Sequence, residues 1–63
     1  MTDEEADALA VERIQHLLIP SAIPGWIRRR VHGFNARPID LIKDGKIDEV
    51  VRKLNEWLQY QPS

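Results

Sequence analysis

The sequence predicts an all-α protein, a small bundle of about four short helices in a single domain. The clearest signal lies in residues 46–59, where apolar side chains recur every three or four positions, as they do along one helix face. Proline and glycine separate this stretch from three further candidate helices at about 3–18, 24–32 and 38–43. No alternation of apolar and polar residues lasts long enough to indicate a strand.

The first predicted element is an N-terminal helix within residues 1–20. Thr2-Asp3-Glu4-Glu5 has the pattern of a capping box, in which the side chains of Thr2 and Glu5 each bind the backbone amide of the other. An amphipathic stretch that begins alanine-rich follows, so its first turns are expected to fray or to dock on a partner. Pro20 is expected to end this helix.

Prolines mark the starts of the next two helices. Pro24 suits the first position of a helix carrying Trp26, and Gly33 suits the position after its end. Pro38 opens a short third helix, and Asp44-Gly45 forms the turn into the fourth. Residues 59–63 are predicted as a polar tail.

The fourth helix has an apolar face and a charged face. Acid-before-base pairs four residues apart, Asp48 with Arg52 and Glu49 with Lys53, favour a helix with a solvated outer face. The apolar stripe continues to Trp57, which we expect in the core or at a dimer contact. Its members are Ile47, Val50, Val51, Leu54, Trp57 and Leu58.

Length and composition indicate that the bundle needs additional stabilisation. A chain of 63 residues buries a small core, and it has no cysteine for a disulfide or a zinc site. We therefore expect a homo-oligomer or a protein partner, with no metal and no cofactor. Without a signal peptide pattern or an apolar run of about 20 residues, the sequence is typical of a cytoplasmic protein that does not contact membranes.

Catalytic chemistry is not indicated, and we expect no enzymatic activity and no catalytic residue. The three glycines are isolated at helix boundaries, and neither Ser21 nor Ser63 lies in a nucleophile motif. His16 falls within an amphipathic helix and His32 near a helix end, where a histidine is far more often solvated than catalytic. A chain this small scarcely forms the pocket that a general base requires.

Charge is unevenly distributed although the net charge is −1. The first twelve residues carry acids and no lysine or arginine until position 13, whereas residues 22–37 carry bases and no acid. This asymmetry indicates an acidic partner, nucleic acid, or pairing with the chain's own other end. Three interpretations of these basic residues remain: a solvated face, a contact with a protein or ligand, or a contact with DNA. A DNA contact would use Arg28, Arg29, Arg30, His32 and Arg37.

Three segments resemble the C-terminal toxin-binding domain of the Xre/MbcA/ParS family of antitoxins. They are IPGWI at 23–27, PIDLIKDG at 38–45 and IDEVV at 47–51, within a matching region of about 23–58. Arg30-Val31 and Asn35-Ala36 stand where the family usually has an asparagine and a Gly-Gly pair. The family's helix-turn-helix, which binds operator DNA, has no counterpart in the residues before the match.

The resemblance implies a module that binds and occludes a protein partner, which in this family is a RES-type toxin that consumes NAD. By position, the contact would fall to Trp57, Tyr60, Gln61 and Pro62, flanked by Arg28, Arg29 and Arg37. The sequence favours this function, with self-association through the first and last helices. The alternatives are a small DNA-binding regulator of phage or mobile-element type, for which nucleic acid is the partner, and a purely structural oligomerisation domain.

Overall fold

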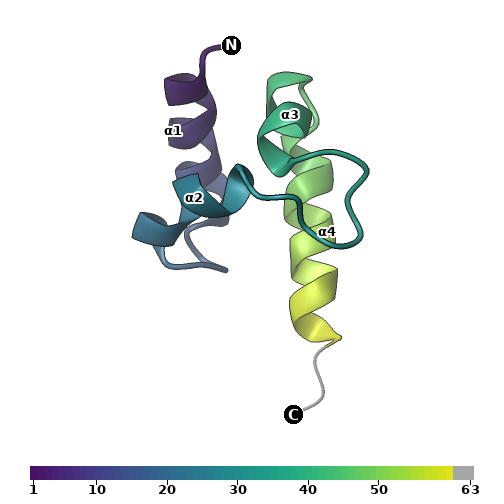
Figure 1. Cartoon of the computed structure of the whole chain (residues 1–63). Helices are drawn as coiled ribbons and strands as arrows, with labels where there is room; N and C mark the ends of the chain where they lie inside the picture. The colour runs from purple at the N-terminus through teal and green to yellow at the C-terminus, as the bar shows by residue number, and fades with distance from the viewer. Residues whose placement is uncertain (61–63) are drawn as a thin grey trace.

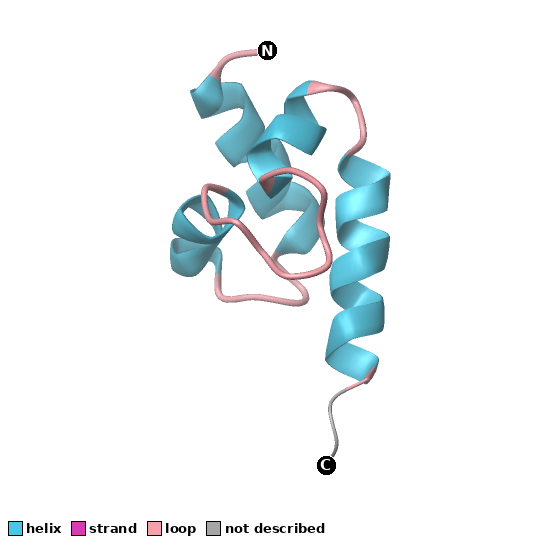
Figure 2. Ribbon diagram, turned by 45° about the vertical axis from the view of Figure 1, so that its right-hand side comes forward, coloured by secondary structure: helices cyan, strands magenta, loops and turns pink. Residues whose placement is uncertain are grey.

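A computed structural model describes residues 1–60 and confirms the all-α fold. Within these residues there is no strand (Figures 1 and 2). No helix in this part of the chain is both long and apolar enough to cross a membrane. The elements in order are α1 (Asp3–Ile14), the 3₁₀ turn η1 (Pro20–Ala22), α2 (Ile23–Ile27), α3 (Pro38–Lys43) and α4 (Ile47–Gln59).

The core lies where α1 meets α2, α3 and α4. Ala6, Ala10 and Ile14 are spaced four residues apart on α1 and are fully buried. The two alanines leave room for the bulkier side chains opposite them, so one face of the alanine-rich start of α1 is packed against the rest of the protein while Ala8 on the other face is exposed. The remaining buried apolar residues of the core are Ile23, Ile27, Ile39, Ile42, Ile47, Val50 and Leu54.

The start of α1 is as expected, but its end is not. The Glu5 amide donates to Thr2 Oγ1 at 3.1 Å and the Thr2 amide donates to Glu5 Oε1 at 3.0 Å, which confirms the capping box. The helix ends at Ile14 instead of near residue 18. The amides of Leu17 and Leu18 both donate to the Ile14 carbonyl, at 2.7 and 3.1 Å, and this turn brings both leucines against the core.

The second helix is also shorter than expected. It ends at Ile27, and the Arg28 and Arg29 amides donate to carbonyls three residues back, the tighter pattern of a helix that is ending. The arginines therefore lie in a turn and in the loop after it. Gly33 has a φ of 93°, as a turn glycine does, but it lies within this loop and does not cap α2.

The junction between α3 and α4 follows the sequence closely. α3 starts at Pro38, and Gly45 has a φ of 81°. The Gly45 amide donates to the Ile42 carbonyl at 3.0 Å and the Lys46 amide donates to the Leu41 carbonyl at 2.8 Å. These two bonds are those of a Schellman motif, which closes α3 and directs the chain into α4.

Only one of the two expected ion pairs on α4 is present. Lys53 pairs with Glu49 at 3.4 Å, as predicted. Asp48 instead pairs with Arg13 of α1, and Arg52 pairs with Glu56 at 3.7 Å. The Arg13–Asp48 pair joins α1 to α4, and the spacing of charges within one helix does not predict such a pair.

The expectation of a core position for Trp57 is wrong. Ile47, Val50 and Leu54 of the apolar stripe are buried, but Trp57 is 53% exposed. The C-terminal turns of α4 extend past the loop that joins α1 to α2 (Figure 1), and there Trp57 is exposed while Leu58 stays half-buried against the core. The stripe thus begins in the core and is only partly covered at its end.

Candidate functional site

The loop between α2 and α3 packs against both α2 and α4 through Phe34. The Phe34 ring stands edge-on to Trp26 of α2, with centroids 6.0 Å apart and planes at 88°. On its other side, Lys53 Nζ of α4 lies 5.4 Å from the Phe34 centroid, within the range of a cation–π contact. These contacts fix the loop beside the exposed end of the apolar stripe.

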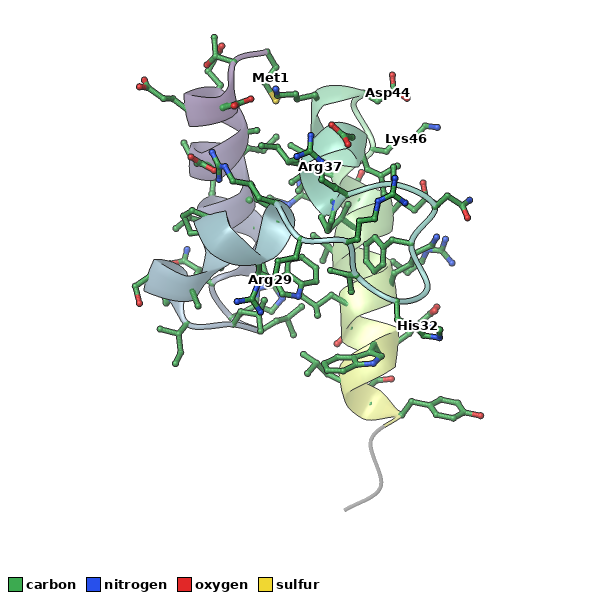
Figure 3. The ribbon with its side chains drawn as sticks, in the orientation of Figure 1. Met1, Arg29, His32, Arg37, Asp44 and Lys46 are labelled. Carbon is green, nitrogen blue, oxygen red and sulfur yellow. The ribbon has the colours of Figure 1, made fainter. Side chains whose placement is uncertain are left out.

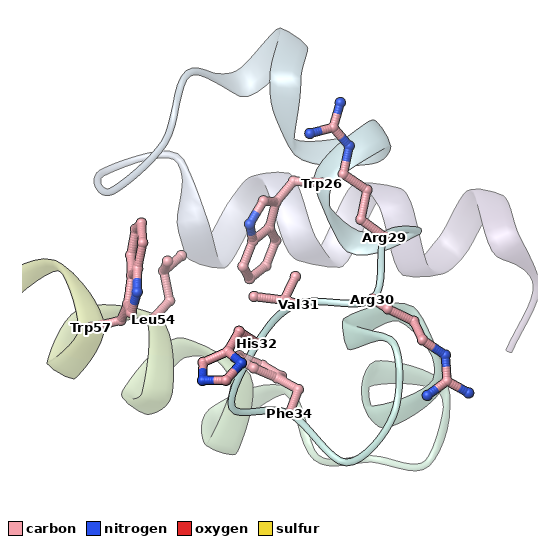
Figure 4. A pocket seen from close by; sticks show the side chains of 8 residues that line it. All are labelled: Trp26, Arg29, Arg30, Val31, His32, Phe34, Leu54 and Trp57. Carbon is pink, nitrogen blue, oxygen red and sulfur yellow. The ribbon is translucent and has the colours of Figure 1, made fainter.

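A hollow of about 270 Å³ lies between α2, this loop and α4 (Figure 4). Its apolar part comes from Trp26, Val31, Phe34, Leu54 and Trp57. Arg29, Arg30 and His32 complete the lining, and no acidic side chain takes part. Figure 4 shows Arg29 and Arg30 on the opposite side of the hollow from Trp57, with their guanidinium groups extending outward.

A second hollow of about 380 Å³ adjoins the first. The two share His32, Phe34 and Trp57, and the second also includes Tyr60, which is 90% exposed. We refer to the two hollows together as the Trp57 surface. The lining of the second hollow is completed by Gly33, Lys53 and Glu56.

The arginine cluster is divided between internal ion pairs and the Trp57 surface. Arg28 Nη1 and Nη2 donate to the two carboxylate oxygens of Asp7 at 2.7 and 3.0 Å, and Nη1 also donates to the Pro24 carbonyl at 2.7 Å. Arg37 binds both carboxylate oxygens of Asp40 at 3.1 and 3.3 Å. Within residues 1–60, Arg29 and Arg30 make no such pair, so they are the arginines available to a ligand.

The ion pairs have the expected electrostatic effect on their members. The hydrogen bonds that Arg28 donates to Asp7 raise the pKa of Arg28, and those that Arg37 donates to Asp40 raise the pKa of Arg37. On the acidic end of the chain, Lys43 pairs with Asp3 and lowers the pKa of that carboxyl. Pairing with the chain's own other end therefore accounts for part of the charge asymmetry in the sequence.

The structure separates the residues that the sequence singled out. Trp57, Tyr60 and His32 meet at the second hollow, whereas Arg28 and Arg37 are held in ion pairs away from both hollows. Gln61 and Pro62 lie outside the described residues. In the described part of the chain, no group of three or more His, Cys, Asp or Glu side chains is arranged to hold a metal ion.

Sequence reasoning missed Phe34 as part of the apolar lining of the hollow. The helix predicted at about 24–32 would point Val31 toward the core, but Val31 and Phe34 both lie in the loop after α2, where helical periodicity gives no information about their contacts. The signal that could have found them is the presence of two large apolar residues in a basic, glycine-containing loop, since such side chains are rarely left without a packing partner. The same predicted helix would point Trp26 into the core, but Trp26 is half-buried and lines the hollow.

Comparison of the chain with protein-family models, with curated proteins and with solved structures finds no match.

Proposed function

We propose that this protein is a small protein-binding module that holds its partner on the Trp57 surface and occludes the region it covers. The observation that carries the proposal is the position of Trp57, which is 53% exposed at the meeting point of two hollows and next to the exposed Tyr60. Leaving such side chains in water forgoes the free energy of their burial, which a partner can recover.

The composition of the surface supports protein binding. Tryptophan, tyrosine and arginine are the residues most enriched among those that dominate the binding energy of protein interfaces. All three types occur here, beside hollows that can receive side chains of a partner. An apolar centre with charged residues at its edge is the usual arrangement of such an interface.

The antitoxin type is the form of this function that the sequence motifs favour. The IPGWI segment forms α2, the PIDLIKDG segment forms α3 with its Schellman motif, and IDEVV begins α4. These elements supply Trp26 and the helix that carries Trp57 to the surface. In this proposal, the partner is an enzyme of the RES-type toxin class, and binding blocks its active site.

DNA binding is the alternative, and the exposed Arg29 and Arg30 favour it. Against it, two of the four arginines in residues 28–37, Arg28 and Arg37, are already bound to carboxylates of the chain, which leaves fewer cations for phosphate contacts.

Homodimerisation through α1 and α4 is a further expectation, to be measured by size-exclusion chromatography with light scattering over a range of protein concentrations.

The proposal is tested by affinity capture from a host lysate at low and high salt, with and without nuclease. We expect one protein to be retained at high salt and lost with Trp57→Ala. The matched control is Ile19→Ala, because Ile19 is 70% exposed and lines neither hollow. Retention only of nuclease-sensitive material that salt removes would overturn the proposal in favour of DNA binding, since phosphate contacts weaken steeply with salt.

A further inference from the structure

We infer that the hollow between Trp26 and Trp57 receives an acidic peptide segment of the partner, which inserts a bulky apolar side chain and places its carboxylates against Arg29 and Arg30. This inference rests on the proposed function and specifies the chemistry of the partner. It follows from the distribution of charge and apolar surface around the hollow.

The apolar part of the hollow requires an apolar anchor. Aromatic and aliphatic side chains from three separate elements form it, among them Trp26, Phe34 and Leu54. A concave apolar site with few polar groups binds by burying an apolar side chain, and its polar groups orient the ligand. A uniformly charged segment would leave this part of the surface unfilled.

The charged part of the hollow requires an anion. Its lining holds two arginines and a histidine and no acid, and within residues 1–60 neither Arg29 nor Arg30 is neutralised by a carboxylate. Arginine binds carboxylates through paired, charge-assisted hydrogen bonds. Because both guanidinium groups extend outward (Figure 4), the carboxylates of the ligand would lie just outside the hollow and flank the inserted side chain.

The second hollow gives the bound segment a direction. Glu56 lines it beside Tyr60, at the side of Trp57 away from the arginines. Lys53 lines the same hollow and Glu56 pairs with Arg52 at 3.7 Å, so the charge there is balanced. Arg29 and Arg30 have no carboxylate partner within residues 1–60, so the acidic end of the ligand lies at these arginines and its uncharged end continues toward Tyr60.

The test is an NMR titration of the full-length, 15N-labelled chain with three synthetic peptides that differ only in charge. Each contains two leucines and a neutral tail, preceded by three glutamates, three glutamines or three lysines. We expect the glutamate peptide to shift backbone amides at 26–34 and 54–57 and to bind about fivefold or more tighter than the glutamine peptide, given two exposed ion pairs. The lysine peptide is expected to bind most weakly.

Two charge-matched double variants locate the contact. Arg29→Gln with Arg30→Gln is expected to reduce the preference for the glutamate peptide to less than about twofold, because it removes the two proposed ion pairs. Lys43→Gln with Lys46→Gln lowers the net charge equally, and neither lysine lines a hollow or pairs with a residue that does, so this variant should keep the preference. Figure 3 shows Lys46 near Asp44, remote from Arg29.

Several outcomes would overturn the inference. These are equal binding of the three peptides, loss of the preference in the Lys43 and Lys46 variant, no shift with the glutamate peptide, and tighter binding of an oligothymidylate at the same amides. Amide shifts at the hollow that depend on protein concentration alone would assign it to a second copy. A protein captured through Trp57 without dependence on Arg29 and Arg30 would leave the proposed function standing while overturning the acidic ligand.

Discussion

Phe34 packs edge-on against Trp26, with ring centroids 6.0 Å apart and planes at 88°. This pair joins the loop to α2, and the Lys53 ammonium on the other side of Phe34 joins the same loop to α4. The loop carries no regular secondary structure between Arg30 and Arg37, so these side-chain contacts hold it in place. The position of this loop, and with it the shape of the Trp57 surface, therefore depends on Phe34.

Replacing Phe34 should destabilise the protein and disturb the surface together. Phe34→Ala removes a half-buried ring and its aromatic contact, and we expect a loss of about 1–3 kcal/mol in the free energy of unfolding. Phe34→Leu keeps most of the apolar volume and should lose less. Urea denaturation measures the free energy of unfolding of both variants. Equal stability of Phe34→Ala and the parent would show that the loop does not depend on Phe34.

A second prediction separates the two ends of the apolar stripe on α4. Leu54 is 2% exposed, and Leu54→Ala should cost about 2–5 kcal/mol because it leaves a cavity in the core. Trp57→Ala should cost less than half as much as Leu54→Ala, although it removes a larger side chain, because Trp57 is 53% exposed. Urea denaturation of both variants tests this order, and the reverse order would place Trp57 in the core.

The sequence was sufficient to predict the elements whose signals are local. The capping box of α1, the proline start of α3, the Asp44-Gly45 turn and the apolar face of α4 all depend on residues within a few positions of one another. Each of these features is present in the structure. Hydrogen bonding, steric restriction and apolar spacing within a few residues indicate them, so they can be predicted without knowledge of tertiary contacts.

What could not be predicted depends on residues far apart in the chain. The exposure of Trp57 follows from where α1 and α2 end, since periodicity shows which face of α4 is apolar but not how much of it is covered. The pairing of Arg28 with Asp7 depends on the packing of α2 against α1. This ion pair distinguishes Arg28 from Arg29 and Arg30, although the three consecutive arginines are equivalent in the sequence.

Acid should weaken the fold partly through Asp3. The hydrogen bond and the charge of Lys43 lower the pKa of Asp3 below its ordinary 3.8. A carboxyl whose pKa is lower in the folded state contributes stability above the unfolded-state pKa, and this contribution is lost as pH falls through the folded-state pKa. We therefore expect the free energy of unfolding to decline below about pH 5.

The Asp3→Asn variant should show a shallower decline over the same pH range, because it lacks the carboxyl that titrates. Glu4→Gln is the control, since it removes a carboxylate from the same helical turn that has no ion pair within residues 1–60. Thermal unfolding followed by circular dichroism at several pH values compares the three proteins. If stability declines as steeply with falling pH in Asp3→Asn as in the parent, the Asp3–Lys43 pair is not a cause of the acid sensitivity.

Two glycines of different conformation give the last prediction. Gly45 has a φ of 81° in the Schellman motif between α3 and α4, where an alanine would be strained by about 1–2 kcal/mol even though no atom lies within 4 Å of its added Cβ. Gly25 lies inside α2 without a positive φ, and a Cβ there also meets no atom within 4 Å. Gly25→Ala should stabilise the protein by about 0.5–1 kcal/mol, because alanine loses less backbone entropy on folding than glycine does. Both substitutions replace glycine by alanine at an open position, so changes of opposite sign in the free energy of unfolding, measured by urea denaturation, would reflect backbone conformation alone. Equal changes would mean that the turn before α4 does not require Gly45.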